Sequence, residues 1–138
     1  MRAIESGAGG VYIVYREATD EPVWLEQSVG GTWRGDPSVS RDELVANWDD
    51  GAHVVYIGKA NHGQLRNRLR AYCSFGEGGE GRHYGGRLIW QMESSADLIV
   101  AWRMISDRAI DPFKVEQNML RRFRAVYGRL PFANLTGG

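Results

Sequence analysis

Two short triplets that pair a tyrosine with a glycine are the part of this sequence best suited to chemistry. Gly10-Val11-Tyr12 and Tyr56-Ile57-Gly58 lie in apolar, β-branched runs, residues 11–15 and 54–57, which are typical of buried strands. A phenolic hydroxyl beside a glycine on a buried strand is unusual, and here it occurs twice. Together with a nearby arginine and a distant glutamate, the two triplets suggest chemistry on a phosphodiester.

The arginine is Arg68, which lies on the apolar stripe of a helix expected over about residues 63–73. The stripe consists of residues at i, i+4 and i+7: Leu65, Leu69 and Tyr72. A buried guanidinium needs a partner or a pocket, because an unpaired buried charge costs several kcal/mol. The alternative is an arginine that reaches from the edge of the stripe to solvent. Arg66 and Arg70 point away from the stripe, toward solvent or a polyanion.

The glutamate is Glu116, which lies on the apolar stripe of the last helix. Asp111-Pro112 predicts the start of this helix and Gly128 its end. Four residues form the expected stripe: Phe113, Leu120, Phe123 and Tyr127. A carboxylate among them indicates either a salt bridge, for instance with Arg68, or a metal ligand in a cleft. Mg²⁺ prefers one or two carboxylates together with phosphate oxygens and water.

Two histidines are further candidates for contact with a phosphate. His62 lies in a turn before the Arg68 helix, and His83 follows a glycine-rich loop. Either imidazole is suited to bind a phosphate or to assist proton transfer, and either is equally compatible with a plain loop residue. No spacing of His and Cys is typical of a zinc site, and no nucleotide-binding fingerprint occurs.

The elements that must position these side chains form a small α/β (α+β) domain. Strands are expected over residues 10–16, 53–58 and 98–102, with a short strand over 23–25. Helices are expected from a capping box at Ser40 and Glu43 to about residue 48, over 63–73, over 87–92 and from 111 to 128. Residues 75–81 have the composition of a mobile segment, and the apolar tail over residues 130–135 is expected to dock back onto the domain.

The length of 138 residues fits one domain, residues 1–138, and its charge is unevenly distributed although the net charge is zero. Residues 1–58 hold 4 Lys/Arg against 10 Asp/Glu, whereas residues 59–138 hold 13 against 7. Residues 17–51 alone contain 9 acidic and 2 basic residues, and we term them the acidic segment. The basic half could therefore face a polyanion while the acidic half faces away; a solvated mixed surface is the alternative.

The location of the protein is predicted from its cysteine content and its N-terminus. With Cys73 as the single cysteine, no internal disulfide is possible, and a reducing cytoplasm is the default. The N-terminal residues lack the apolar stretch of a secretory signal, and no run of apolar residues is long enough to span a membrane. Three tryptophans in the acidic segment (Trp24, Trp33 and Trp48) indicate that it packs on the body of the domain; stacking on bases is the alternative.

These residues resemble the GIY-YIG nuclease superfamily. The similarity is carried by the two triplets, by Lys59-Ala60 after the second one, and by the arginine-bearing residues 65–72. The closest similarity is to the incision domain of bacterial excision-repair nucleases, where YIGKA precedes such a helix. Glu116 and the later Asn134 resemble the glutamate and asparagine of that family. Here 43 residues, 13–55, separate the triplets, so the resemblance implies a long insertion between the first two core strands.

The resemblance implies a three-stranded antiparallel sheet flanked by helices and a metal-dependent endonuclease that acts on DNA. Tyr12 and Tyr56 would orient or deprotonate the attacking water, which requires a lowered tyrosine pKa. Arg68 would bind the scissile phosphate, and Glu116 would hold Mg²⁺ or Mn²⁺. Lys59 would support the phosphate or lower the pKa of a tyrosine. The candidate substrate-binding residues are His62, Arg66, Arg70, His83 and Asn134, the last of which would also brace the site.

Two alternatives to an endonuclease follow from the same sequence. One is a non-catalytic module that keeps the fold and binds nucleic acid or protein, with the acidic segment covering the basic cleft or recruiting a partner such as a separate DNA-binding subunit. The other is a small-molecule hydrolase that uses the same cleft. Salt-dependent binding of DNA without cleavage would favour the binding module.

Overall fold

The structure, a computed structural model, describes residues 4–27, 38–76 and 84–134 and is built around a three-stranded sheet. The strands are β1 (Gly9–Tyr15), β2 (Val54–Ala60) and β3 (Ile99–Ile105), all antiparallel, in the order β2-β1-β3. Helices α1 (Arg41–Asn47), α2 (Leu65–Gly76) and α3 (Pro112–Tyr127) accompany it, with two 3₁₀ helices, η1 (Tyr84–Gln91) and η2 (Ser95–Asp97). The expected α+β class with a small antiparallel sheet is confirmed.

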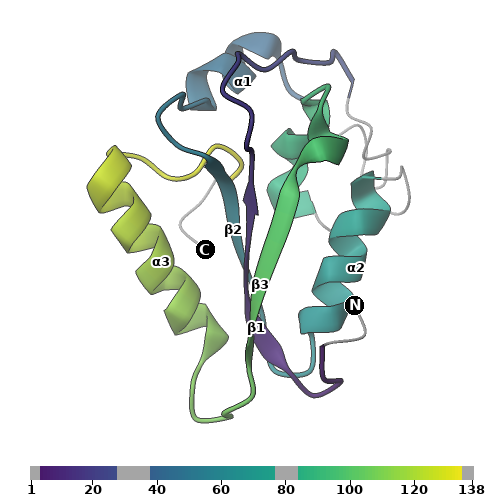
Figure 1. The fold of residues 1–138 in the computed structure, drawn as a ribbon, viewed down its shortest axis with the longest axis vertical. Coiled ribbons are helices and arrows are strands. Elements are labelled where there is room, and N and C mark those ends of the chain that lie inside the picture. The colour runs from purple at the N-terminus through teal and green to yellow at the C-terminus, as the bar shows by residue number, and fades with distance from the viewer. Residues whose placement is uncertain (1–3, 28–37, 77–83, 135–138) are drawn as a thin grey trace.

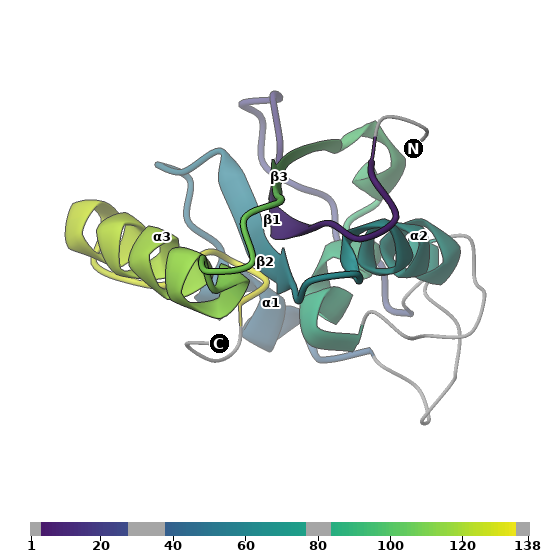
Figure 2. The same ribbon diagram turned by 90° about the horizontal axis from the view of Figure 1, so that it is seen from below.

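Helices α2 and α3 lie on opposite sides of the sheet, as the two perpendicular views show (Figures 1 and 2). The alternation of side chains along the strands produces this arrangement, because one face of β1 and β2 packs on α2 and the other on α3. Tyr12 and Tyr56 face α2 within the larger core, while Ile13 and Ile57 face α3 in a smaller one. Both triplet tyrosines therefore point to the same side of the sheet.

Most element boundaries agree with the sequence. Ser40 caps α1 by accepting a hydrogen bond from the Glu43 amide, and Asp111 caps α3 in the same way through the Phe113 amide. β3 extends three residues beyond the expected strand, and the helix expected over 87–92 forms as η1. The strand expected over 23–25 is reduced to one bridge between Trp24 and Met92. The segment expected to be mobile begins within α2 and continues, over residues 77–81, outside the described residues.

The apolar stripe expected on α3 is wrong at both ends. Leu120 and Phe123 are buried, but Phe113 and Tyr127 are 44% and 40% exposed. Pro112 and Glu116 take the buried positions of the first turns instead. The helix contacts β2 and β1 through its middle, so its outer turns present apolar side chains to solvent. Spacing along a helix gives the angle of a side chain but not where the sheet beneath it ends.

The acidic segment packs on the body of the domain, as its tryptophans indicate. Trp24 and Trp48 contact each other and both contact Phe132 of the tail, with ring centroids 5.2–5.7 Å apart. Trp33 lies outside the described residues. The buried side chain of Gln91 adds a polar tie, because its amide accepts a hydrogen bond from the Val39 amide and donates to two backbone carbonyls of the segment.

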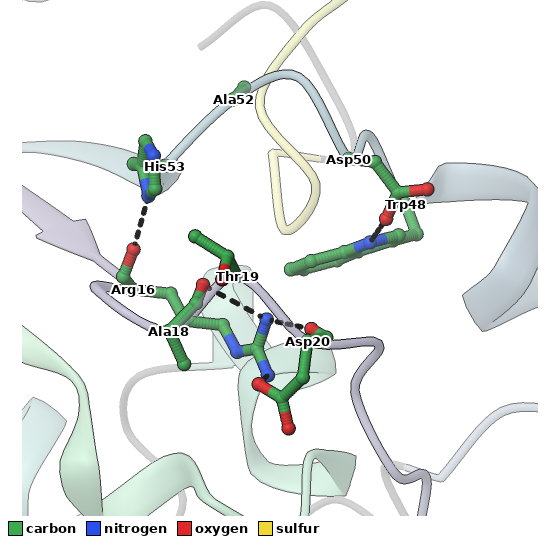
Figure 3. Close-up of a pocket in the computed structure, with 8 residues that line it drawn as sticks. All are labelled: Arg16, Ala18, Thr19, Asp20, Trp48, Asp50, Ala52 and His53. Carbon is green, nitrogen blue, oxygen red and sulfur yellow. Dashed lines mark hydrogen bonds and ion pairs between the residues drawn. The ribbon is translucent and has the colours of Figure 1, made fainter.

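The two ends of the acidic segment meet where β1 stops and β2 begins (Figure 3). The Arg16 amide donates to the His53 carbonyl, and the His53 ring donates from Nδ1 to the Arg16 carbonyl at 2.7 Å. The buried Arg16 guanidinium pairs with Asp20 at 2.9 Å and lies over the Trp48 ring. This cluster closes the base of the segment.

The tail covers the outer edge of β2. The Ala133 amide donates to the Val55 carbonyl, and the Asn134 side chain both accepts from the Ile57 amide and donates to the Ile57 carbonyl, each at 2.9 Å. These bonds replace a neighbouring strand, since an edge strand otherwise leaves its backbone groups unpaired. The expected docking of the tail is confirmed. Among the described residues, no helix has the length and apolar character needed to cross a membrane.

Gly58 is required by the ring of Tyr12. The two residues are partners across β1 and β2, and a Cβ atom at position 58 would lie 2.4 Å from Cζ and 2.6 Å from the hydroxyl oxygen of Tyr12. The tyrosine ring therefore crosses β2 at the one position without a side chain. This contact gives a physical reason for a glycine in the second triplet.

We expect Gly58→Ala to lower the free energy of unfolding by about 1–3 kcal/mol, the usual cost of overpacking a core. Gly7→Ala is the matched control, because a Cβ there meets no atom within 4 Å and the change should stay within about 0.5 kcal/mol. Urea unfolding followed by circular dichroism measures both. Equal stability of the two variants would contradict the close approach of Tyr12 to Gly58.

Candidate active site

Tyr12 and Tyr56 form the centre of the candidate site. Tyr56 is the β2 partner of Val14, two positions along β1 from Tyr12, and both rings point toward α2. Their ring centroids lie 6.0 Å apart at an angle of 44°, and both side chains are buried. The triplets, 43 residues apart in sequence, thus bring two phenols into contact.

The two hydroxyls form a hydrogen bond that distinguishes them chemically. This bond acts in opposite directions on the two groups, raising the pKa of Tyr12 and lowering that of Tyr56. The Tyr12 hydroxyl also hydrogen-bonds with Arg68.

Burial nevertheless raises the pKa of both tyrosines above the ordinary value, and this is the largest effect at each. The positive charge of Arg68 opposes it at both hydroxyls, while the negative charge of Glu116 adds to it at Tyr56. The expected lowering of a tyrosine pKa is therefore wrong: Arg68 acts in that direction, but the pKa of each tyrosine is raised overall. Desolvation outweighs the charges, so both phenols are protonated at neutral pH.

Arg68 enters the site from α2. The residues of its expected stripe are buried, and the arginine itself is half-buried and interacts with both tyrosines. Of the two alternatives that the sequence left open, the structure thus favours an arginine with partners. Its guanidinium supplies a fixed positive charge beside the two hydroxyls.

Glu116 enters from α3, and only 6% of its surface is exposed. Burial raises the pKa of its carboxyl group, while the charges of Lys59 and Arg68 lower it. Oε1 accepts a long hydrogen bond of 3.5 Å from Gln117. Lys59 lies at the end of β2, where Nζ donates to Oδ1 of Asn61 at 3.2 Å. Five residues from four elements thus interact electrostatically: Tyr12, Tyr56, Lys59, Arg68 and Glu116.

The surroundings of Glu116 fit a hard divalent cation with few protein ligands. The carboxylate is buried, yet among the described residues its one hydrogen bond, of 3.5 Å from Gln117, leaves most of its lone pairs available. Mg²⁺ keeps several waters and is held by one or two carboxylates with substrate phosphates. Within residues 4–27, 38–76 and 84–134, no group of three or more His, Cys, Asp or Glu side chains could enclose a metal. A metal here would depend on Glu116, water and substrate.

Three candidate substrate-binding residues hold backbone instead of facing the tyrosines. The Arg66 guanidinium donates to the Ile4 carbonyl, and His62 donates from Nε2 to the Ile110 carbonyl at 2.8 Å. The Asn134 amide is bound to Ile57 through both of its polar atoms, which braces β2 beside Tyr56.

Of the remaining two candidates, Arg70 is exposed on α2 and is not part of the cluster, whereas His83 lies outside the described residues. Sequence reasoning missed two polar neighbours, Asn61 beside Lys59 and Gln117 beside Glu116. The only signal for either was adjacency to a charged candidate, which is too common a feature to single them out.

No family model, no curated protein and no solved structure matches the chain. The chemistry that the cluster can perform therefore rests on its own residues.

We expect Glu116→Gln to stabilise the fold at neutral pH. Because burial raises the pKa of Glu116, the folded protein keeps the carboxyl proton to a higher pH than the unfolded chain does. Stability then falls as pH rises from the ordinary glutamate range through the raised pKa. The variant lacks this titration, so its advantage over the wild type should grow with pH and vanish near about pH 4.

Urea unfolding across this pH range measures the effect, with the exposed Glu93→Gln as matched control. A variant less stable than the wild type at neutral pH would mean that Lys59 and Arg68 hold the carboxylate more strongly than burial opposes it.

Proposed function

We propose that this protein is a metal-dependent endonuclease of the GIY-YIG type that hydrolyses phosphodiester bonds of DNA. The observation that carries the proposal is the mutual interaction of two phenols, a guanidinium and a buried carboxylate, drawn from β1, β2, α2 and α3. Such a set combines a group that orients water, a cation for a phosphate and a ligand for a divalent ion, which phosphodiester hydrolysis requires.

In this proposal Arg68 binds the scissile phosphate. Its side chain is half-buried and is held in place by the Tyr12 hydroxyl, so its charge is oriented before substrate arrives. A preorganised cation of this kind stabilises the additional negative charge of the transition state. Lys59, at the end of β2 and within the field of Glu116, is the second positive group near the phosphate.

In its ionised form, after its own proton has passed to solvent, Tyr56 is proposed to orient the attacking water and to take up its proton. Tyr12 is hydrogen-bonded to Tyr56 and is fixed over Gly58, so it holds the Tyr56 oxygen in a defined position. Attack forms a bond from the water oxygen to phosphorus, and the bond from phosphorus to the 3′-oxygen breaks. The leaving 3′-oxygen takes up a proton from solvent, so the products are a 5′-phosphate and a 3′-hydroxyl.

Glu116 is the residue proposed to hold Mg²⁺ or Mn²⁺. A bound divalent ion would supply positive charge at the phosphate and at the leaving oxygen. Neutralising Glu116 would also remove the negative charge that raises the pKa of Tyr56, which makes deprotonation of the phenol easier.

DNA is the proposed substrate because most of the positively charged residues lie in the half of the sequence that carries the site. Residues 59–138, which carry Lys59, Arg68 and Glu116, hold 13 Lys/Arg against 7 Asp/Glu. An excess of positive charge favours a polyanion, whereas the acidic segment repels it. This polarity would direct the duplex toward α2 and α3.

We expect the purified protein to nick plasmid DNA with Mg²⁺ and to lose this activity with a chelator. Arg68→Ala, Glu116→Gln and Tyr56→Phe should each lower the rate by about 10²–10³-fold, as removal of a preorganised charge or hydrogen bond typically does. Arg121→Ala on the exposed side of α3 and the exposed Glu93→Gln are matched controls and should cleave normally.

Cleavage that persists in both Arg68→Ala and Glu116→Gln would refute the assigned roles. Salt-dependent binding of DNA, measured by fluorescence anisotropy, without cleavage under any divalent ion would favour the non-catalytic binding module. Absence of binding at low salt would count against both.

We also expect the cleavage rate to rise with pH. The proposed proton acceptor has a pKa above its ordinary value, so its ionised fraction increases by about tenfold per pH unit throughout the neutral range. Rates measured between about pH 6 and 9 at saturating Mg²⁺ test this dependence. A flat profile in the wild type would exclude Tyr56 as the group that takes the proton.

A further inference from the structure

An open pocket of about 340 Å³ lies in the acidic segment and contains none of the residues of the tyrosine cluster. Its walls come from the chain after β1 and from α1 and the turn that follows it. The residues that matter here are Glu21, Trp24, Arg41, Val45, Trp48 and Asp50. The volume is at the lower end of the range for small-molecule pockets, about 300–1,000 Å³.

Two tryptophans form rigid aromatic walls. The Trp24 and Trp48 rings meet edge to face, with centroids 5.7 Å apart and an angle of 74°. Phe132 packs against both of them, which fixes their orientation from the core side. Aromatic faces attract cations, and tryptophan does so most strongly.

Carboxylates accompany these walls. Oδ1 of Asp50 accepts a hydrogen bond from Nε1 of Trp48 at 2.6 Å, which ties the acid to the edge of the ring. Glu21 also lines the pocket and is exposed to solvent. The acidic segment around them holds 9 Asp/Glu against 2 Lys/Arg, so the local field favours positive charge.

The protein already places a guanidinium in equivalent surroundings on Trp48. The neighbouring small cavity shares Trp48 and Asp50 with this pocket, and there Arg16 lies 5.6 Å from the ring centroid and is paired with Asp20 (Figure 3). The combination of the Trp48 ring and a carboxylate is thus used once within the chain to hold a cation.

We propose that this pocket binds a cationic head group on an aliphatic stem, an alkylammonium or guanidinium such as a lysine or arginine side chain presents. The head group lies against the paired Trp24 and Trp48 rings on one side and faces the carboxylates on the other. The stem lies against Val45. Arg41 is the one positive residue among those that line the pocket, and it opposes such a ligand. The site does not depend on the proposed nuclease activity.

The test uses the intact protein and small probes. N-acetyl-lysine methylamide and N-acetyl-arginine methylamide are titrated while the indole N–H signals of the tryptophans are followed by NMR. Their neutral counterparts, the norleucine and citrulline derivatives, are the matched probes. We expect shifts of the Trp24 and Trp48 signals with the cations, and at least tenfold weaker binding of the neutral probes. A short basic peptide is titrated in parallel, and its affinity is compared with that of the small probes. The comparison shows whether the pocket prefers the cationic group on a small molecule or on a polypeptide.

Two variants that change a charge but leave the aromatic rings intact test whether the pocket selects positively charged ligands. Glu21→Gln should weaken binding of the cations several-fold, and Arg41→Ala should strengthen it. Glu26→Gln, an exposed acid of the same segment outside the pocket, is the matched control and should bind as the wild type does. Trp24→Leu should abolish binding, with retention of fold checked by circular dichroism.

Three results would overturn the proposal. One is absence of any shift of the two indole signals at probe concentrations up to about 10 mM, where millimolar affinity is visible. Another is equal binding of the norleucine and lysine probes, which would indicate a merely apolar pocket. The third is weaker cation binding by Arg41→Ala.

Discussion

The contact between the Tyr12 ring and Gly58 is the constraint on which the rest of the site depends. With no side chain at position 58, the ring crosses β2, and its hydroxyl reaches both Tyr56 and Arg68. Any Cβ at position 58 would occupy the space of the phenol, and the two strands could then pair only if the ring turned elsewhere. One glycine thus links the register of β1 and β2 to the position of two hydroxyls and of the arginine on α2.

Around this contact the surroundings disfavour the charged forms of three side chains. Burial raises the pKa of Tyr12, Tyr56 and Glu116 together, and Arg68 offsets the effect only in part. Titratable groups in surroundings that disfavour their charged form are found most often at functional sites. Such a site lacks part of the compensating charge until a substrate or metal binds. The bracing of β2 by Asn134 fits this arrangement, since it holds the backbone beside Tyr56 without adding a charge.

The acidic segment and the tail stabilise one another through aromatic contacts. Trp24 and Trp48 pack on Phe132, and the buried amide of Gln91 satisfies the backbone of the segment. The same tail continues to the edge of β2. A long, charged connection between two adjacent strands is therefore integrated into the core through aromatic side chains, as its tryptophan content indicates.

The sequence by itself determined the strands, the caps of α1 and α3 and the inward positions of Arg68 and Glu116, because local periodicity and capping chemistry depend on near neighbours in the chain. Tertiary structure decided which charges meet. It assigned Arg66 and His62 to backbone carbonyls, exposed Phe113 and Tyr127 where α3 extends past the sheet, and made burial dominate the pKa of the tyrosines. Desolvation and the extent of a packed face depend on residues distant in sequence, and spacing along one helix or strand carries no information about them.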